Sequence, residues 1–431
     1  MQNIEMYIRD RYDNDIYWFE KEVEQAEHLT RITNVINNRN YLAGKHKILN
    51  REDSKWKEQE FITKKLILNQ AKTIMNFHST YLLGKPLCLI GSEKKVAEYQ
   101  KVYRLGDYNN IDYKVLDNVN KYADCFEYVY MDNKVIKSKL ILPEDGYPIY
   151  SEDTGEYIAF IEHYTCNSNC VSYYNVYYPT KVECWDNQGG ELLLKESKIN
   201  VSGLPIHHTN DDSRSLLEDL KPIFDEFEDI MSKMSDSIYT LSLNPIPVSI
   251  GQRIEGNIPA DACGFMINLD AGDMKYVNAN IDSNTIKLYF EKLQQQLNII
   301  AHMPSIALGN SNVANVSEVS LKLLYQLADV QAMLNEKWFR VGLNKRFAIF
   351  DKLLSMKGIT FSEDEYIDVE FTYARPVNTS EVLDNLKKQY EMMAISTQTI
   401  IEKSPYTITA QELERLKESK SMGNNMGNNI E

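Results

Sequence analysis

The longest amphipathic patterns of the chain lie between residues 281 and 354. One apolar face is predicted from the residues Ile286, Tyr289, Phe290, Leu293, Leu297 and Ile300. Their spacings of three and four indicate a helix, which Pro304 ends. A second helix is predicted from Glu318 onward, because Ser317 is a good N-cap residue. Its apolar face is expected at Val319, Leu323, Leu327, Val330, Leu334, Trp338 and Val341. The small, uncharged segment between the two helices is either a core hairpin loop or a loop presented to a partner.

Helical spacing recurs along much of the remaining chain. It covers residues 1–38, 61–83, 93–103, 113–123, 213–243, 380–393 and 409–418. Gly84 followed by Pro86 is a typical helix end. The 213–243 helix carries seven acidic and three basic residues, a pattern that most often marks a solvated face.

Strand patterns dominate the region from residue 87 to about residue 205. They cover residues 126–131, 135–142, 157–165, 171–178 and 180–185, and one further strand is predicted at residues 368–374. The Asp132–Lys134 segment between the first two is a hairpin signal. We therefore expect an α+β fold that contains an antiparallel or mixed sheet.

Composition places this chain among folded proteins, and its length allows either about two to four domains or one elongated subunit built of several layers. It has 431 residues, of which 43% are hydrophobic and 25% charged. No run of about 18 apolar residues predicts a membrane span, and the first residues lack the apolar core of a signal peptide. We therefore expect no membrane association and synthesis in a cytosol. The repeated Met-Gly-Asn-Asn near the end is expected to be disordered.

The net charge of −15 restricts the ways in which the chain can contact nucleic acid. Tight binding to DNA usually depends on basic side chains that neutralise phosphates. An acidic chain is therefore a poor static DNA binder, but it suits a conduit through which DNA slides without adhering.

Two groups of residues are candidates for metal or acid–base chemistry. His163, Cys166, Cys170 and Cys184 offer zinc-binding side chains, although their spacing differs from the common CxxC pattern. His207 and His208 precede two aspartates, and we interpret them as a surface turn before the next helix. Nucleotide-binding and hydrolase motifs are absent from the sequence. We expect no catalysis, cofactor or metal, with a metal-dependent enzyme as the alternative.

Five short motifs follow one another in a characteristic order. They are Tyr41-x-x-Gly44-x-His46-x-Ile48-Leu49, Asn69-x-Ala71-Lys72, Tyr81-Leu-Leu-Gly-Lys-Pro86, Leu204-Pro205 ahead of an acidic helix, and Ala374-Arg375-Pro376-Val-Asn378 with Glu381. Together with the helix–loop–helix pattern, they resemble the SPP1-type portal proteins of tailed bacteriophages. One difference is Ser317-Glu318-Val319-Ser320, where that family usually has Ser-Gly-x-Ala.

The resemblance implies an elongated, multi-domain subunit in a ring of about twelve copies. Its expected parts are a wing with a β-rich region (1–212), a stem helix (213–243), a small α/β clip (244–280), a second stem helix (281–303), a tunnel loop (304–317), a long helix with a return strand (318–374), and a helical crown with a disordered tail (375–431). The ring would sit at one capsid vertex in the virion, after assembly in the host bacterial cytoplasm. A structural adaptor of a phage-derived particle is the alternative within this class.

The resemblance also implies the partners and the contact residues. Double-stranded DNA would pass through the ring without sequence specificity, touching Leu308, Gly309, Asn310, Ser311, Asn312 and Asn315 of the tunnel loop. The terminase large subunit and the head–tail connector would bind the clip at Arg253, Glu255, Asp261, Asp270 and Asp273. The major capsid and scaffolding proteins would be further partners.

Overall fold

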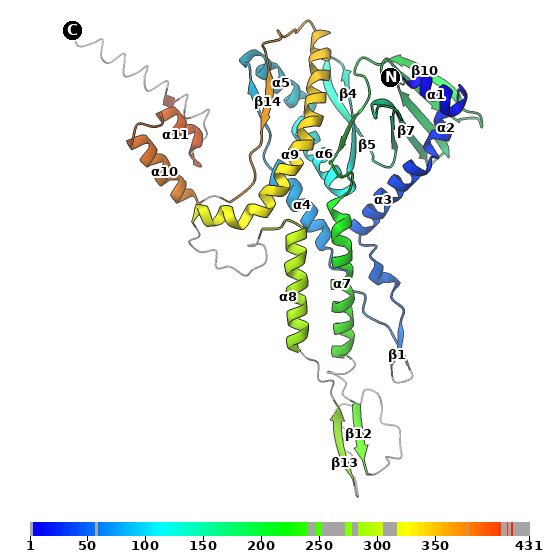
Figure 1. Ribbon diagram of the computed structural model, residues 1–431, viewed down its shortest axis with the longest axis vertical. Helices are drawn as coiled ribbons and strands as arrows, with labels where there is room; N and C mark the ends of the chain where they lie inside the picture. Colours follow the sequence, from blue (N-terminus) through cyan, green and yellow to red (C-terminus); the bar gives the residue numbers. More distant parts are fainter. Residues whose placement is uncertain are drawn as a thin grey trace, which may run out of the picture. The chain divides into compact units, whose positions relative to one another are not determined.

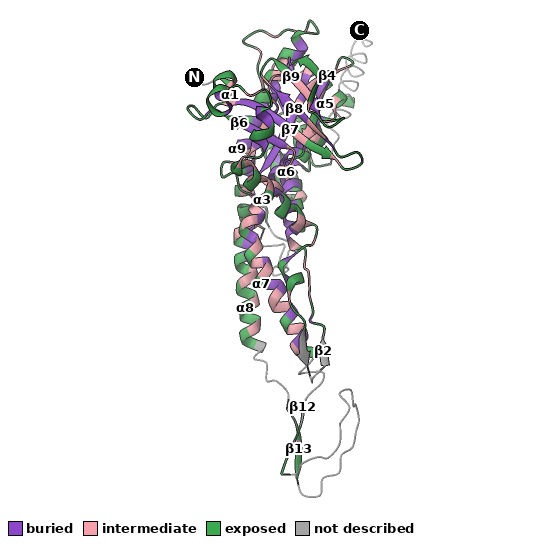
Figure 2. Cartoon of the chain, turned by 90° about the vertical axis from the view of Figure 1, so that its right-hand side faces the viewer, coloured by how far each residue is buried: buried purple, intermediate pink, exposed green. Residues whose placement is uncertain are grey.

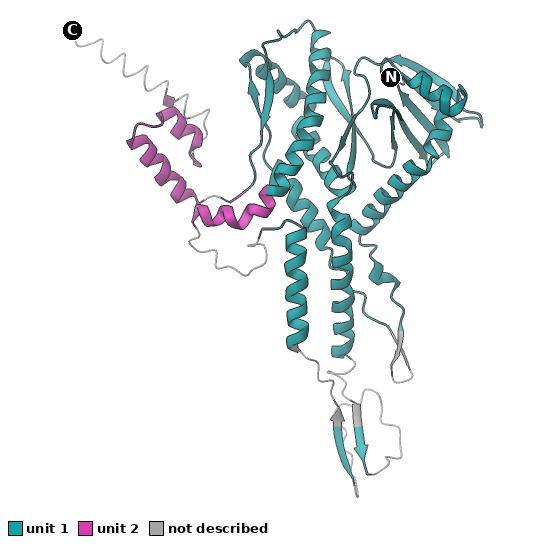
Figure 3. Cartoon of the chain, viewed as in Figure 1, with its two compact units in different colours: residues 1–303, 330–374 teal, residues 304–329, 375–431 magenta. Residues whose placement is uncertain are grey.

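A computed structural model gives the fold of the chain (Figure 1). It describes residues 3–56, 59–239, 246–251, 272–277, 283–304, 317–376, 378–406, 412 and 415–416. The chain divides into two compact units (Figure 3). Unit 1 comprises residues 1–303 and 330–374, and unit 2 comprises residues 304–329 and 375–431.

A five-stranded antiparallel sheet in unit 1 has the strand order β10-β9-β8-β7-β6. Its strands are β6 (Gly146–Tyr150), β7 (Tyr157–Cys166), β8 (Val171–Tyr177), β9 (Lys181–Asp186) and β10 (Leu193–Ile199). Helices α1 (Ile4–Tyr12) and α2 (Trp18–Val23) share a core with this sheet. In that core Phe19 packs against Tyr174 and Trp185, with ring centroids 5.3 Å apart in each pair. The N-terminal helices therefore cover the sheet.

A second antiparallel sheet in unit 1 has the order β11-β4-β5. Its strands are β4 (Asp124–Asp132), β5 (Val135–Ile141) and β11 (Ile206–Thr209). Asn133 and Lys134 both have positive φ, as a two-residue hairpin turn requires, and this confirms the predicted hairpin. Helices α5 (Glu93–Gly106) and α6 (Tyr108–Tyr122) pack against this sheet. Phe126 of β4 contacts Phe160 of β7, so the two sheets share a core.

Long helices occupy the remainder of unit 1. They are α3 (Ala26–Leu42), α4 (Gln70–Leu83), α7 (Leu216–Ser237), α8 (Ser283–Ile300) and α9 (Glu318–Ser355), whose first residues count with unit 2. Short strands pair as β1 (Ser54–Trp56) with β2 (Gln59–Phe61), β3 (Cys88–Gly91) with β14 (Ile367–Glu370), and β12 (Ile246–Ile250) with β13 (Asp273–Val277). Helix α7 buries far more of its side chains than α8 does (Figure 2).

Helix α9 confirms the predicted helix but not the predicted buried face. Of the seven expected core positions only Trp338 is buried, whereas Val319, Leu323 and Val341 are more than half exposed. The buried face instead consists of Phe339, Leu343, Arg346, Phe347, Phe350, Leu353 and Leu354, among others. The wrong prediction arose because the pattern was taken from the most regular apolar spacing, and that spacing follows the solvent side of the single chain.

The predicted 61–83 helix was also wrong in its first third. Helix α4 begins at Gln70, and residues 62–69 run without helix or strand. The strands β6 and β10 and the helix α11 (Thr397–Lys403) were not predicted either. The mixture of helices and antiparallel sheets itself agrees with the expected α+β class.

Unit 2 contains helices α10 (Thr379–Glu391) and α11 in its described part. Asn378 caps α10 through its side chain, which accepts a hydrogen bond from the backbone of Glu381. Arg375 forms an ion pair with Asp329 at 3.1 Å. Most of the predicted 409–418 helix lies outside the described residues. Within the described residues, no helix is both long enough and apolar enough to cross a membrane.

Candidate functional site

The turn after α3 meets the middle of helix α7. The ring of Tyr41 stacks on the imidazole of His46, with centroids 3.9 Å apart. The Tyr41 hydroxyl donates to Asp225, and His46 Nδ1 lies 2.7 Å from a carboxylate oxygen of Glu228. His46 Nε2 lies 2.8 Å from the carbonyl oxygen of Tyr41. Both ring nitrogens of His46 therefore have a partner inside the fold.

The glycine of the same turn has a conformational reason to be there. Gly44 has φ of +89°, in the left-handed region that favours glycine. The side chain of Asn69 lies about 4 Å from where a Gly44 Cβ would be, and Asn69 itself precedes α4 with φ of +49°. Two motifs that are far apart in the sequence therefore meet beside α7.

Residues 62–69 form an extended strap along α7. Three alternate backbone N–H groups donate to three α7 side chains: Lys64 to Asp236, Leu66 to Ser232, and Leu68 to Glu228, all at 2.9–3.0 Å. The donors are every second residue of the strap, and the acceptors are every fourth residue of α7. Two residues of the extended strap therefore span about the same length as one turn of the helix. Glu228 and Ser232 are almost fully buried there. Glu228 and Asp236, which the sequence pattern assigns to a solvated face, therefore hold the strap.

Helices α7 and α8 pack through a shared apolar core. Phe227 contacts Phe290 at 5.8 Å between ring centroids, and Leu297 of α8 is 2% exposed. The Tyr289 hydroxyl donates to Glu226 at 3.1 Å. Beyond α8, His78 of α4 contacts the carbonyl oxygen of Ala301, and burial lowers the pKa of His78 to about 4. The helix pair is therefore fixed to the body of unit 1.

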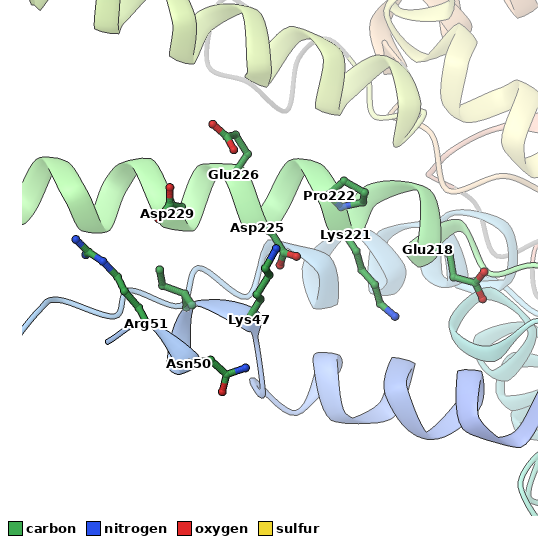
Figure 4. A pocket seen from close by; sticks show the side chains of 10 residues that line it. Lys47, Asn50, Arg51, Glu218, Lys221, Pro222, Asp225, Glu226 and Asp229 are labelled. Carbon is green, nitrogen blue, oxygen red and sulfur yellow. The ribbon is translucent and has the colours of Figure 1, made fainter. Parts of the chain in front are cut away.

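An open groove of about 920 Å³ lies between α7 and the short 3-10 helix η1 (Lys47–Asn50) (Figure 4). We call it the stem groove, and it is lined by Lys47, Ile48, Asn50, Arg51, Glu218, Lys221, Pro222, Asp225, Glu226 and Asp229. Figure 4 shows Lys47 and Arg51 reaching toward α7, while Glu226 points toward α8. Arg51 pairs with Asp236 at 2.7 Å, and Lys221 donates to Asn38.

A fully buried charge cluster ties α9 to the second sheet. Arg346 of α9 donates to one carboxylate oxygen of Glu127 on β4 and to Asp112 on α6. His208 Nε2 lies 2.9 Å from the same Glu127 oxygen. Burial opposes the charged form of Glu127, but Arg346 and His208 outweigh it and lower the Glu127 pKa to about 2. Burial raises the pKa of Asp112 to about 6 despite Arg346.

The cluster corrects the prediction for the two adjacent histidines. His207 and His208 belong to strand β11, where side chains alternate between faces, and not to a surface turn. His207 contacts Asp124 and the Tyr150 hydroxyl, whereas His208 is 1% exposed beside Glu127. Sequence reasoning missed Arg346, because a charged residue on a predicted helix is normally assigned to its solvated side.

The zinc candidates are spread over one hairpin and the next strand. His163 stacks on Tyr174 of β8, and Cys166 contacts the Ser168 hydroxyl in the turn that contains Cys170. Cys184 lies on β9. Within the part of the chain that the structure describes, no three His, Cys, Asp or Glu side chains are grouped so that they could hold a metal ion.

Most of the predicted contact residues lie outside the described ranges. These are Leu308, Gly309, Asn310, Ser311, Asn312 and Asn315 of the predicted loop and Arg253, Glu255, Asp261 and Asp270 of the predicted clip. Asp273 of the predicted clip lies within the described ranges. It is the first residue of β13 and is exposed, and its carboxylate lies 3.4 Å from Nζ of Lys275. Two of the recognised motifs also meet, since the backbone N–H of Ala374 donates to the carbonyl oxygen of Tyr81.

Comparison with known proteins assigns this chain to a family. The family model described as phage portal protein, SPP1 Gp6-like, matches residues 21–426. The chain therefore belongs to the SPP1 Gp6-like family of phage portal proteins, as its motifs predict. The portal protein of Bacillus phage SPP1 is 22% identical over 395 residues, which cover 83% of this chain and 76% of that protein.

Two solved structures resemble the chain more distantly. One is the neck of an empty GTA particle computed with C6 symmetry: 10% identity, a TM-score of 0.47, and coverage of 77% of this chain and 88% of that one. The other is the virion of a native gene transfer agent particle: 10% identity, a TM-score of 0.41, and coverage of 76% and 86%.

Proposed function

We propose that copies of this chain form a closed ring at one vertex of a phage capsid. The ring is the channel through which double-stranded DNA is packaged and later ejected. Membership of the portal protein family, with a match over residues 21–426, carries the proposal. The chain has no catalytic role of its own in this proposal, and the packaging motor supplies the chemical energy.

The helix pair α7 and α8 is the stem of the proposed subunit. A conduit needs rigid walls, and the strap, the Tyr41–His46 turn and the Phe227–Phe290 contact each immobilise α7 or α8. Residues 1–212 and the α9 region are the wing, residues 244–280 the clip, and residues after 375 the crown. The clip is the docking platform for the terminase large subunit and the head–tail connector, and capsid and scaffolding proteins hold the ring at the vertex.

The proposed tunnel loop, residues 304–317, is suited to DNA that must move. Its sequence contains Ser, Asn, Ala and Gly and no formal charge, so it offers weak contacts to phosphate at any DNA sequence. The chain's net charge of −15 disfavours adhesion of DNA to the channel.

Native mass spectrometry of the purified full chain, together with negative-stain images, tests this proposal. We expect closed rings of about twelve or thirteen copies with a central hole. A chain that stays monomeric or dimeric, both alone and with its scaffolding protein, would contradict the proposal.

A further inference from the structure

The turn that joins strands β7 and β8 has a cysteine at each end. Cys166 is the last residue of β7 and lies opposite Val171 in the ladder, and Cys170 directly precedes β8. The backbone N–H of Cys170 donates to the carbonyl oxygen of Cys166 at 2.8 Å. With standard backbone bond lengths, this hydrogen bond keeps the two Cα atoms within about 7 Å of each other. Cysteines at such a separation can be joined by a disulfide.

Side-chain contacts across the hairpin hold this turn in place. The rings of Tyr164 and Tyr173 are stacked with their centroids 5.2 Å apart, and the hydroxyl oxygens of Thr165 and Ser172 are 2.9 Å apart. Both pairs lie next to the turn on the two paired strands. The hairpin itself therefore keeps the two cysteines near each other.

The thiol of Cys166 has an environment that favours its reactive form. Its sulfur lies 3.1 Å from the hydroxyl oxygen of Ser168. The hydroxyl and the backbone N–H of Ser168, together with the N–H of Asn169, stabilise the thiolate and lower the pKa of Cys166. The thiolate is the form that attacks a disulfide. Cys166 is partly exposed and Cys170 is exposed, so a small oxidant can reach both.

The other described cysteines lack this combination. Burial raises the pKa of Cys125 to about 12 and also raises that of Cys184. Cys88 is exposed, but it lies on β3 in a different sheet. A structural zinc ion takes four ligands, whereas the described residues place no group of three metal-binding side chains together here. Two adjacent thiols are therefore suited to oxidation.

We propose that Cys166 and Cys170 are an oxidisable dithiol whose oxidant is a low-molecular-weight disulfide. The Cys166 thiolate attacks one sulfur of the oxidant, so that a mixed disulfide forms and one half of the oxidant leaves as a thiolate. The Cys170 thiolate then attacks the Cys166 sulfur, which closes the protein disulfide and releases the second half. The two protons of the protein thiols end on the two released thiolates. The protein loses two electrons, and the oxidant gains them.

The product is a covalent bond across the tip of the β7–β8 hairpin. A reducing cytosol keeps such a pair as thiols, whereas oxidising surroundings favour the disulfide. In a particle of the kind that the proposed function describes, the hairpin tip would thus be cross-linked only after release from the host cell. The dithiol chemistry belongs to a single chain and does not depend on the proposed ring.

Peptide mapping by mass spectrometry tests the pair in the purified full chain after treatment with oxidised glutathione. In wild type, we expect the peptide with both cysteines to lose two hydrogens at least about threefold faster than Cys88 gains glutathione. In Cys170→Ser the second attack is blocked, so a glutathione adduct should accumulate on Cys166. In Cys166→Ser no disulfide should form at Cys170, which should react no faster than Cys88.

Two serine variants test the environment of the Cys166 sulfur. Ser168→Ala should slow disulfide formation by about threefold or more, because the thiolate loses its hydroxyl donor. Ser172→Ala is the matched control, since the Ser172 hydroxyl contacts Thr165 instead and its loss should leave the rate unchanged. Equal rates in these two variants would contradict the role of Ser168.

Three results would overturn the dithiol. The first is a wild-type chain that accumulates glutathione on Cys166 as fully as Cys170→Ser does, because the second thiol would then not reach the first. The second is no change in this peptide after Cys88 has reacted. The third is a disulfide from either cysteine to Cys88 or to another chain. Normal rings alongside any of these results would leave the proposed function intact, and an oxidisable pair in a chain that forms no rings would overturn the proposed function alone.

Discussion

Arg346 of α9 and Glu127 of β4 form an ion pair in which both side chains are fully buried. The Nε and Nη2 groups of Arg346 donate to the same Glu127 oxygen at 3.1 and 2.8 Å. Arg346 is the largest fully buried side chain among the described residues. A long helix and a sheet strand that are 219 residues apart in the sequence are thus joined by charge inside the apolar core.

Removal of Arg346 should destabilise the fold strongly. Arg346→Met leaves Glu127 and Asp112 buried without their cation, and we expect a loss of about 3–5 kcal/mol in the free energy of unfolding. Urea unfolding followed by circular dichroism measures it. Arg340→Met is the control, because Arg340 pairs with Glu336 and Asp368 at the surface and should cost about 1 kcal/mol or less. Equal losses in both variants would contradict the buried cluster's importance.

The close approach of α9 to β11 predicts a specific double-mutant result. A Cβ at Gly342 would overlap the imidazole of His208, so Gly342→Ala should cost about 1–3 kcal/mol in the free energy of unfolding. In a His208→Ala background the overlap disappears, and the same change should cost less by at least about 0.5 kcal/mol. Thermal or urea unfolding of the four proteins gives the coupling. If the costs of Gly342→Ala and His208→Ala simply add, α9 does not contact His208 at Gly342.

The raised pKa of Asp112 predicts a pH dependence with a definite sign. Its pKa is about 6 in the folded chain against an ordinary value of 3.8, so its contribution to stability is fully present below pH 3.8 and is lost as the pH rises through 6. The Asp112→Asn variant lacks this titrating carboxyl group. The stability of wild type relative to this variant should therefore fall by roughly 2 kcal/mol between about pH 4 and pH 7.

Glu127→Gln is the contrasting variant in the same cluster. The pKa of Glu127 is lowered to about 2, so its contribution is present above its ordinary value of 4.5 and lost only as the pH falls through 2. The stability difference between wild type and Glu127→Gln should stay constant between about pH 5 and pH 7. Parallel pH profiles for the two variants would contradict the assignment.

The strap should loosen when one of its acceptors is removed. Ser232→Ala removes the buried acceptor of the Leu66 N–H, and we expect a cost of about 1–3 kcal/mol in the free energy of unfolding. Hydrogen exchange read by mass spectrometry should accelerate in residues 62–69. Ser235→Ala on the same helix is the control and should change stability by less than about 0.5 kcal/mol. Unchanged exchange in the Ser232 variant would show that other contacts hold the strap.

The uncharged sequence of the proposed tunnel loop predicts a packaging defect without an assembly defect. Asn312→Asp adds a negative charge to each copy, and the charges repel DNA in the channel. We expect normal rings and at least about tenfold less DNA per particle, measured by quantitative DNA extraction from purified particles. Asn312→Gln keeps the loop uncharged and should package normally. Full packaging by the Asn312→Asp variant would show that residue 312 does not contact DNA.

The sequence predicted the long helices and the meander strands because local periodicity reports them directly. Helices α7, α8 and α9 and the β4–β5 hairpin were predicted within a few residues of their observed ends. The buried side of a helix is harder to predict, because periodicity does not say which of two apolar stripes a single chain buries. On α9 the regular stripe at Val319, Leu323 and Val341 is exposed, and the side with Phe339 and Phe350 is buried.

Long-range hydrogen bonds account for the other errors. Residues 62–69 have helical spacing, but side chains of α7 that lie more than 150 positions later take their backbone N–H groups. His208 and Arg346 have no local signal of burial, because each is compensated by Glu127 from a distant strand. The motif residues Tyr41 and His46 were identified only through the resemblance, and the structure gives their physical role beside Asp225 and Glu228.

The strap also determines how the α7 region bears mechanical load. Its three hydrogen bonds are spaced along the axis of α7, and each joins a different helical turn to the same extended segment. A force directed along that axis stretches all three bonds in shear at once, whereas a force perpendicular to it peels them one after another. The attachment therefore resists a force along the α7 axis more than a force that pulls the strap sideways away from the helix.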